Sequence, residues 1–207
     1  MSFELTQKEG EYLVKLARQA AETYLTKRQI LEVPMDVPAK LKKQCGVFVT
    51  INAVEGKRHQ LRGCIGLPYP TTMLAKAVIE AAISSAAQDP RFEPMSPKEL
   101  DNVVFEVSVL TPPEPIEVEK PQDYCSNIKV GRDGLIVERT YCKGLLLPQV
   151  PVELGWNEET FLCECCVKAG LQPDSWLLKG TKVYRFQAII FSETEPKGDI
   201  VRKEISS

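Results

Sequence analysis

The sequence is poor in histidine: His59 is the only one among 207 residues. A single histidine excludes any site that requires two, such as the HExxH zinc site. The Walker, Rossmann and GxSxG signatures are missing as well, so none of the familiar nucleotide, dinucleotide or hydrolase sites is predicted. We therefore predict no cofactor and no metal.

Long hydrophobic runs are also missing. Apolar stretches such as MLAKAVIEAAISSAA (73–87) are interrupted by charge, and nothing approaches the roughly 20 apolar residues that cross a bilayer. The beginning of the sequence, MSFELTQKEGEYL, is polar and carries acidic residues, and it has neither the basic start nor the apolar run of a signal peptide. The 26 Lys and Arg nearly balance the 28 Asp and Glu, so net charge predicts neither nucleic acid nor an anionic membrane as a partner.

Seven cysteines are present, but their odd number and irregular spacing do not resemble the disulfide framework of a secreted protein. A reducing compartment fits best, and we expect a cytoplasmic protein. In FLCECC, Cys165 and Cys166 fall on the apolar stripe of a predicted helix with Phe161 and Leu162. Because no nearby CxxC pair or histidine completes a set of four zinc ligands, the pattern favours core packing.

Periodicity and capping signals predict mixed helices and strands in the first half of the chain. The expected elements are a helix from Thr6 to Lys27, strands at 45–54 and 61–66, a helix from Thr71 or Thr72 to 88, a short helix after the capping box at 96–99, and a strand at 102–111.

The segment TPPEPIEVEKP (111–121), with four prolines and three glutamates, predicts a linker. It divides one domain, 1–207, into a larger lobe of 1–111 with 181–207 and a smaller lobe of 112–180. Beyond the linker we expect two short strands in 128–138, an extended segment at 144–156 whose prolines exclude a helix, a helix from Asn157 to Ala169 and a strand at 183–191.

The segment QLRGCIG (60–66) carries the most suggestive chemistry. In an unbroken strand Arg62 and Cys64 share one face, and a partly buried guanidinium lowers the pKa of a neighbouring thiol. The alternative is that Cys64 packs as a small apolar residue between glycines, which is the commoner role of free cysteine. His59 falls on the opposite face, which disfavours a Cys-His pair unless a bulge at Gly63 shifts the alternation.

Three further features are candidates for binding. Asp89 and Arg91 flank a proline after a helix, where the pair either fastens the turn or holds a ligand. Glu106 is the one charge inside the 102–111 strand and requires either a partner or a cleft. A basic patch at 57–62 predicts either phosphate contact or a solvated hairpin tip, and no aromatic residues interleave with it.

Taken in order along the chain, several segments closely resemble the AMMECR domain family. They are CGVFVTI (45–51), LRGCIG (61–66), AAQDPRF (86–92), EVSVLTPPE (106–114), GLLLPQVPVELGW (144–156), FL (161–162) and CVKAGL (166–171). The chain looks like a stand-alone prokaryotic or archaeal member. The resemblance implies an α+β fold with two lobes, mainly an antiparallel sheet flanked by helices with a smaller α/β lobe.

The residues that match the family motifs form the candidate site. They are Leu61, Arg62, Gly63, Cys64, Ile65 and Gly66 in the LRGCIG motif, with Asp89, Arg91, Glu106, Gln149 and Glu153 in the others. The resemblance implies an association with Memo-like and radical-SAM proteins in a modification pathway. It identifies no reaction, so fold analogy cannot supply one.

Three functions remain open at this point. We favour a non-catalytic accessory or interaction module in which LRGCIG is a structural corner. The second hypothesis is an enzyme or enzyme component with a cleft lined by Arg62, Cys64, Glu106 and Arg91, in which Cys64 is the nucleophile or a contact residue. The third is RNA or nucleotide binding through the 57–62 patch, which predicts a steep dependence of affinity on salt.

Overall fold

The computed structural model describes residues 3–56 and 58–204, which form two compact units. The first unit contains the chain up to Leu110 together with Ile189–Lys203, and the second contains Thr111–Ala188. Each unit is built on its own antiparallel sheet, so the predicted α+β class is confirmed. No helix among the described residues is long and apolar enough to cross a membrane.

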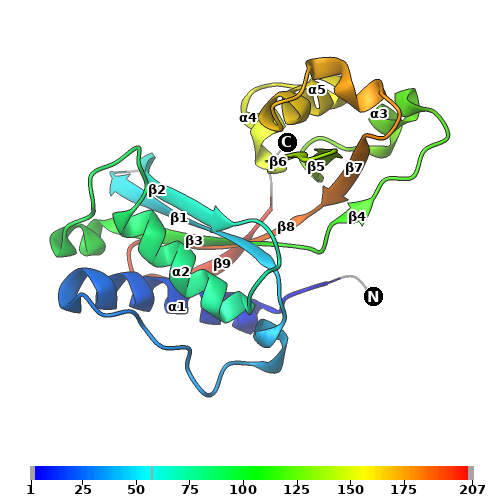
Figure 1. The fold of residues 1–207 in the computed structure, drawn as a ribbon. Coiled ribbons are helices and arrows are strands. Elements are labelled where there is room, and N and C mark those ends of the chain that lie inside the picture. The colour runs from blue at the N-terminus through cyan, green and yellow to red at the C-terminus, as the bar shows by residue number, and fades with distance from the viewer. Residues whose placement is uncertain (1–2, 57, 205–207) are drawn as a thin grey trace. The chain divides into compact units, whose positions relative to one another are not determined.

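The first unit holds a five-stranded sheet in the order β2-β1-β3-β8-β9, so β2 and β9 are its edges (Figure 1). Its elements are α1 (Gln7–Lys27), η1 (Ala39–Lys42), β1 (Gly46–Glu55), β2 (Arg58–Leu67), α2 (Leu74–Ala87), η2 (Pro97–Asn102), β3 (Val103–Leu110), β8 (Ala188–Glu193) and β9 (Ile200–Lys203).

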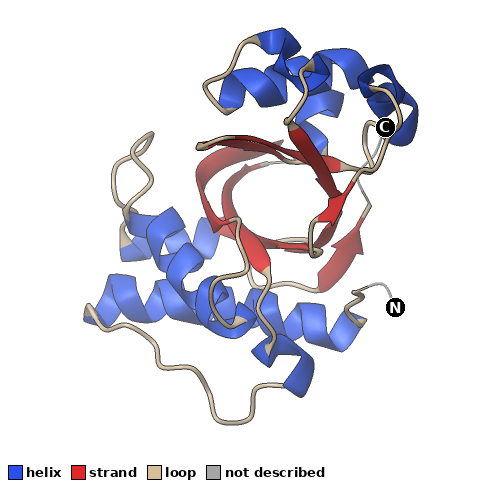
Figure 2. Ribbon diagram, turned by 45° about the vertical axis from the view of Figure 1, so that its right-hand side comes forward, coloured by secondary structure: helices blue, strands red, loops and turns tan. Residues whose placement is uncertain are grey.

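Helices α1 and α2 lie on one face of this sheet (Figures 1 and 2). Helix α1 begins at the predicted capping box, in which the Thr6 hydroxyl accepts from the Glu9 N–H and the Glu9 carboxylate accepts from the Thr6 N–H. The alanine-rich helix α2 allows a close approach to the strands, and its apolar residues join Val49 and Phe105 in one core. The opposite face of the sheet is covered by neither helix.

One buried ion pair ties α1 to the strands. The Arg18 Nε donates to Glu193 Oε1 at 2.6 Å, and both side chains are nearly sealed from solvent. The same guanidinium donates to the carbonyls of Leu100 and Val103, while Glu193 accepts from the Phe105 N–H. Because every one of these groups has a partner, the charges are tolerated inside the core.

The second unit holds a four-stranded sheet in the order β4-β7-β5-β6. Its elements are β4 (Glu114–Pro115), η3 (Pro121–Asp123), α3 (Tyr124–Asn127), β5 (Gly134–Arg139), β6 (Cys142–Leu146), α4 (Gln149–Glu153), α5 (Glu158–Lys168), η4 (Pro173–Leu177) and β7 (Lys182–Phe186). Helix α5 starts at Asn157, whose side chain caps the Thr160 N–H as predicted. Its Cys165 and Cys166 are fully buried in the core of this unit, as the helical stripe predicted.

Two predictions on strands are wrong. The segment 183–191 is not one strand: it divides at Gln187 into β7 and β8, which belong to different sheets. The Gln187 N–H donates to the Thr111 hydroxyl, and its carbonyl accepts from the Thr111 N–H, which marks the crossing between the two sheets. The segment 181–187, predicted for the larger lobe, therefore lies in the second unit.

Only one strand, β5, forms in 128–138, and 128–130 has no strand structure.

Two helix predictions also need correction. A short helix, α4, forms in the 144–156 segment despite its prolines. Pro148 is its N-cap and Pro151 lies in its first turn, where a backbone N–H would have no intrahelical partner. In addition, neither Thr71 nor Thr72 caps α2: the helix starts after Met73 without a side-chain cap.

Candidate functional site

Strand β2 contains a β-bulge at Arg62. Its pairing with β1 runs from Val47 opposite Leu67 to Ile51 opposite Gly63, then resumes with Asn52 opposite Leu61. Arg62 has no partner in β1 and is therefore the extra residue. Residues that are directly opposite each other on β1 and β2 point to the same face of the sheet. The extra residue therefore changes which β2 side chains share a face, and the prediction that Arg62 and Cys64 do so assumed regular alternation.

The bulge separates Arg62 from the Cys64 thiol, and the predicted Arg62–Cys64 pair is wrong. The Arg62 Nε donates to Glu99 Oε1 at 2.7 Å, and Nη2 donates to the Glu93 carbonyl at 2.9 Å. Glu99 also accepts from Ser96 in the predicted capping box. The hydrogen bonds from Arg62 and Ser96 lower the pKa of Glu99 although burial opposes them. The guanidinium thus anchors the segment after α2 and does not activate a thiol.

The arginine nearest Cys64 is Arg91, which acts together with Asp89 on the backbone of Cys64. The buried Asp89 carboxylate accepts from the Cys64 N–H at 2.8 Å, and Arg91 Nη2 donates to the Cys64 carbonyl at 3.1 Å. Asp89 and Arg91 are themselves joined by two side-chain hydrogen bonds of 2.9 and 2.7 Å. The turn therefore closes an edge of the sheet that would otherwise be unpaired at this point.

Charge and aromatic contacts reinforce this turn. The hydrogen bonds from Arg91 hold the pKa of Asp89 far below its ordinary value, against the effect of burial, and Asp89 raises the pKa of Arg91 in return. The Phe92 ring lies near both guanidinium groups, with its centroid 5.5 Å from Arg91 Cζ and 5.8 Å from Arg62 Cζ. The LRGCIG and DPRF segments are thus bound to each other.

Ser85 of α2 provides a second fixed point beside Cys64. Its hydroxyl accepts from the Ile65 N–H at 2.8 Å and donates to the Val49 carbonyl at 2.7 Å. A side chain at Gly63 would meet the Ser85 carbonyl, so only glycine permits α2 to pack this closely on β2. A side chain at Gly66 would meet the ring of Phe48 on β1. Gly63 is therefore required by the backbone of α2, whereas a side chain at Gly66 would displace the Phe48 ring.

The Cys64 side chain belongs to a row of polar residues on the face that α1 and α2 leave uncovered. Cys64 is opposite Thr50, and Thr50 is opposite Glu106 on β3. The Thr50 hydroxyl donates to Cys64 Sγ at 3.2 Å, and Lys203 Nζ donates to Glu106 Oε2 at 2.8 Å. We call Cys64, Thr50, Glu106 and Lys203 the polar row.

Burial raises the pKa of the partly exposed Cys64 thiol above its ordinary value. The Thr50 hydrogen bond and the Arg91 charge act in the opposite direction, while Asp89 and Glu106 raise the pKa further. Since the thiolate is the nucleophilic form, burial acts against an activated thiol at Cys64.

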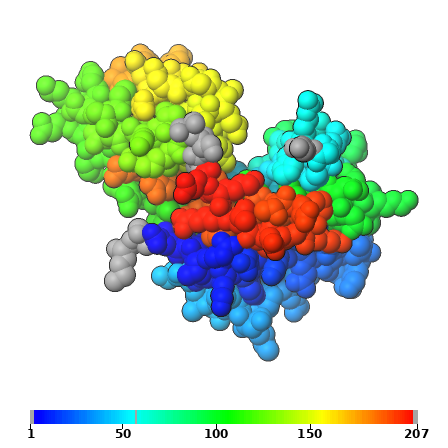
Figure 3. Space-filling model, turned by 180° about the vertical axis from the view of Figure 1, so that it is seen from behind, coloured from blue at the N-terminus to red at the C-terminus, as the bar shows by residue number. Residues whose placement is uncertain are grey.

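Lys203 is the member of the polar row that the sequence did not reveal. It lies on β9, at the far edge of the sheet, where residues 201–203 are exposed (Figure 3, red). Glu106 required a partner or a cleft, and Lys203 is that partner. No local signal connects residues 97 positions apart, because their contact depends on β3, β8 and β9 lying in one sheet.

The bulge places His59 on the same face of the sheet as Cys64. His59 is opposite Val54, Cys64 is opposite Thr50, and Val54 and Thr50 lie on the same face of β1. The two positions are still four residue steps apart along β1, about 13 Å. His59 is exposed and forms no pair with the thiol. In the basic patch, Arg58 and His59 are exposed, Arg62 is bound to Glu99, and Lys57 lies outside the described residues.

Gln149 and Glu153 belong to α4 in the second unit and thus to a different part of the structure from the polar row. Glu153 is exposed. Gln149 Oε1 is buried and has no hydrogen-bond partner among the described residues.

The fold and site define an α+β protein in which the LRGCIG and DPRF segments close one edge of a sheet. Comparison with known proteins shows the same architecture elsewhere. The sequence profile of the AMMECR1 family matches residues 14–191, so the chain belongs to the AMMECR1 family.

Its relatives include archaeal proteins of the same length. A Thermofilum pendens protein is 54% identical over 205 residues, covering 96% of each chain. Pyrococcus horikoshii protein PH0010 is 54% identical over 206 residues, covering 99% of this chain and 100% of the relative. The crystal structure of PH0010 matches with a TM-score of 0.88 and covers 98% of this chain and 100% of that one. The resemblance inferred from the sequence motifs is confirmed.

Proposed function

We propose that the chain is a non-catalytic interaction module that serves Memo-like and radical-SAM proteins in a modification pathway. The observation that supports this most directly is the use of the LRGCIG segment. The Cys64 N–H and carbonyl are both bound by the DPRF turn, and burial raises the pKa of the thiol. The segment is a structural corner, and it supports the sheet face beside it.

We assign the docking surface to that sheet face. It consists of the polar row and its neighbours Phe48, Asn52 and Leu61, which the β1–β2 register places on the same side. Leu61 is 42% exposed, although it is a large apolar residue, and Asn52 is partly exposed. Apolar and polar side chains of this kind together are typical of a surface that binds another protein.

The competing hypothesis is a thiol enzyme built on Arg62 and Cys64. It requires a guanidinium that stabilises the thiolate and binds an anionic substrate group. Arg62 is instead bound to Glu99, and its side chain is only 17% exposed. RNA binding through the 57–62 patch is weakened by the same ion pair, since Arg62 is one of the cations that this hypothesis requires.

Alkylation of Cys64 as a function of pH separates a structural corner from an activated thiol. Iodoacetamide labelling, followed by peptide mass mapping of the segment around Cys64, should be slow at pH 7 and rise only in the alkaline range. Glu106→Gln removes a charge that raises the Cys64 pKa, so it should shift the labelling curve to lower pH. Thr50→Val should shift it to higher pH. Rapid labelling of the wild-type protein at pH 6–7 would contradict the proposal.

Partner binding is tested separately with purified Memo-like and radical-SAM proteins from the same organism. Light scattering after size exclusion should show a complex with the wild-type chain that Leu61→Arg abolishes. Lys15→Arg, an exposed substitution on α1, is the control and should leave the complex intact. If the wild-type chain binds neither protein, the assigned partners are wrong. If Leu61→Arg binds normally, the assigned surface is wrong.

A further inference from the structure

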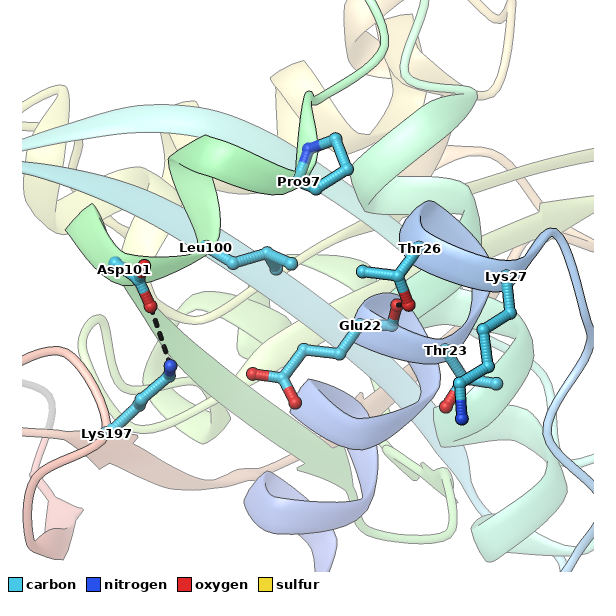
Figure 4. A pocket seen from close by; sticks show the side chains of 8 residues that line it. All are labelled: Glu22, Thr23, Thr26, Lys27, Pro97, Leu100, Asp101 and Lys197. Atoms are coloured by element: carbon cyan, nitrogen blue, oxygen red, sulfur yellow. Dashed lines mark hydrogen bonds and ion pairs between the residues drawn. The ribbon is translucent and has the colours of Figure 1, made fainter.

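The first unit contains a cavity of about 340 Å³, away from the polar row. Three segments far apart in the sequence form it: the last turns of α1, η2, and the turn between β8 and β9 (Figure 4). The lining residues are Glu22, Thr23, Thr26, Lys27, Pro97, Leu100, Asp101 and Lys197. Its volume lies at the lower end of the range typical of small-molecule sites, so the ligand it can hold is small.

The lining combines both signs of charge with an apolar part. Leu100 and Pro97 present hydrocarbon, and Figure 4 shows the Leu100 side chain between the polar groups. Glu22 and Asp101 supply carboxylates on one side of it, while Lys27 supplies an ammonium group on the other, beside the Thr23 hydroxyl. The Thr26 hydroxyl donates to the Glu22 carbonyl at 2.6 Å. A ligand complementary to this lining carries an ammonium group, a carboxylate and a short apolar chain.

Several of these polar groups are available to a ligand. In the part of the chain that the structure describes, neither Lys27 Nζ nor Thr23 Oγ1 makes a hydrogen bond or ion pair. Glu22 reaches Arg18 only at 3.7 Å. Asp101 is bound to Lys197 at 2.6 Å, but both side chains are more than half exposed, and an exposed ion pair is weak enough to exchange partners.

The backbone at Lys197 gives independent support. Its φ is 60°, in the left-handed region, where glycine is the usual residue of a turn. Gly198 follows directly, yet the left-handed position carries a long cationic side chain that extends to Asp101 at the rim of the cavity. The turn thus holds one cation at the rim of the cavity.

We propose that this cavity binds a small zwitterion of the amino-acid class with an apolar side chain. The ligand's ammonium group pairs with Glu22 and Asp101, its carboxylate pairs with Lys27 and the Thr23 hydroxyl, and its side chain packs on Leu100. None of the lining residues belongs to the docking surface, so this site is independent of the proposed interaction function.

Four matched compounds test the ligand class by NMR titration of the full chain. L-Leucine carries all three features, 3-methylbutylamine lacks the carboxylate, 4-methylpentanoate lacks the ammonium group, and glycine lacks the apolar chain. Leucine should bind saturably and shift the amide signals of Thr23 and Leu100. Each of the other compounds should bind at least about tenfold more weakly, because each loses one charged hydrogen-bonded pair or the apolar contact.

Two variants test the location. Lys27→Met removes the cation assigned to the carboxylate, and Thr26→Trp fills the cavity from an exposed position. Both should weaken leucine binding at least about tenfold while retaining the dispersed spectrum of the folded protein. Lys15→Met, the same change about 18 Å earlier on α1, should leave binding unchanged. The proposal is overturned if wild-type protein shows no saturable shift with leucine up to about 20 mM, or if folded Thr26→Trp binds it normally.

Discussion

The Asp89 carboxylate accepts a hydrogen bond of 2.8 Å from the backbone N–H of Cys64, 25 residues earlier in the chain. Asp89 is only 4% exposed, and Arg91 completes the arrangement by donating to the Cys64 carbonyl. A carboxylate and a guanidinium that are already joined to each other thus occupy both hydrogen-bonding groups of one edge residue. This relationship makes the DPRF turn part of the sheet and explains why the two motifs occur together in one chain.

Replacing Asp89 should test that bond directly. Asp89→Ala leaves the Cys64 N–H and part of the Arg91 guanidinium without an acceptor, so we expect a loss of about 1–3 kcal/mol in the free energy of unfolding. Glu93→Ala is the control, because only the backbone carbonyl of Glu93 takes part, in a bond from Arg62. Urea denaturation measures both. Equal stability of the two variants would contradict the role assigned to Asp89.

Wild type and Asp89→Ala also give a prediction for the dependence of stability on pH. The pKa of Asp89 is lowered in the folded state, so its stabilising contribution is fully present above the unfolded-state pKa of about 3.9 and is lost as the pH falls through the folded value. The difference in stability between wild type and Asp89→Ala should therefore be constant near neutrality and decrease below about pH 4. A stability difference that grows on acidification would contradict the lowered pKa of Asp89 in the folded state.

Ser85 offers a second prediction with a neighbouring control. Ser85→Ala removes a hydroxyl that bonds both Ile65 and Val49 in the buried region between α2 and the strands, and we expect a cost of about 1–3 kcal/mol. Ser84→Ala, one position earlier, removes only an exposed bond to Gln88 and should stay within about 0.5 kcal/mol of wild type. Thermal or urea unfolding distinguishes the two. Helix propensity favours alanine at both positions, so a loss for Ser84→Ala as large as that for Ser85→Ala would contradict the role assigned to the buried hydroxyl.

The buried ion pair between Arg18 and Glu193 gives the largest expected effect. Glu193→Gln leaves the Arg18 charge uncompensated in the core and should cost about 3–5 kcal/mol. Glu80→Gln removes one member of an exposed pair with Lys76 and should cost less than about 1 kcal/mol. Both variants are compared by urea denaturation at one ionic strength. A small effect at Glu193 would mean that water reaches the pair.

Local signals predicted much of the secondary structure correctly. The capping boxes at Thr6 and Ser96, the Asn157 cap and the alternation of 102–111 are each decided by residues within a few positions of one another. The errors occurred where a tertiary contact competes with a local signal. The segment 183–191 contains no proline or glycine that would stop a strand, and it divides at Gln187 because that residue pairs with Thr111.

The candidate site was predicted only in part. The residues of the LRGCIG and DPRF segments are in contact, and Glu106 does have a charged partner. The pairing of Arg62 with Cys64 failed because strict alternation assumes a regular strand, whereas one extra residue in β2 reverses the faces beyond it. Lys203 was missed because nothing in its own neighbourhood connects it to Glu106.

The sequence by itself determined the family of this protein and the residue types from which its site is built. The periodicity of apolar residues, the helix caps and the spacing of motifs are properties of short segments. They can be recognised in the sequence without knowledge of the tertiary contacts. Only the tertiary structure decided which arginine adjoins Cys64 and whether the thiol ionises. Both depend on the register of β1 and β2, on the close approach of α2 at Gly63 and on burial, none of which a single segment contains.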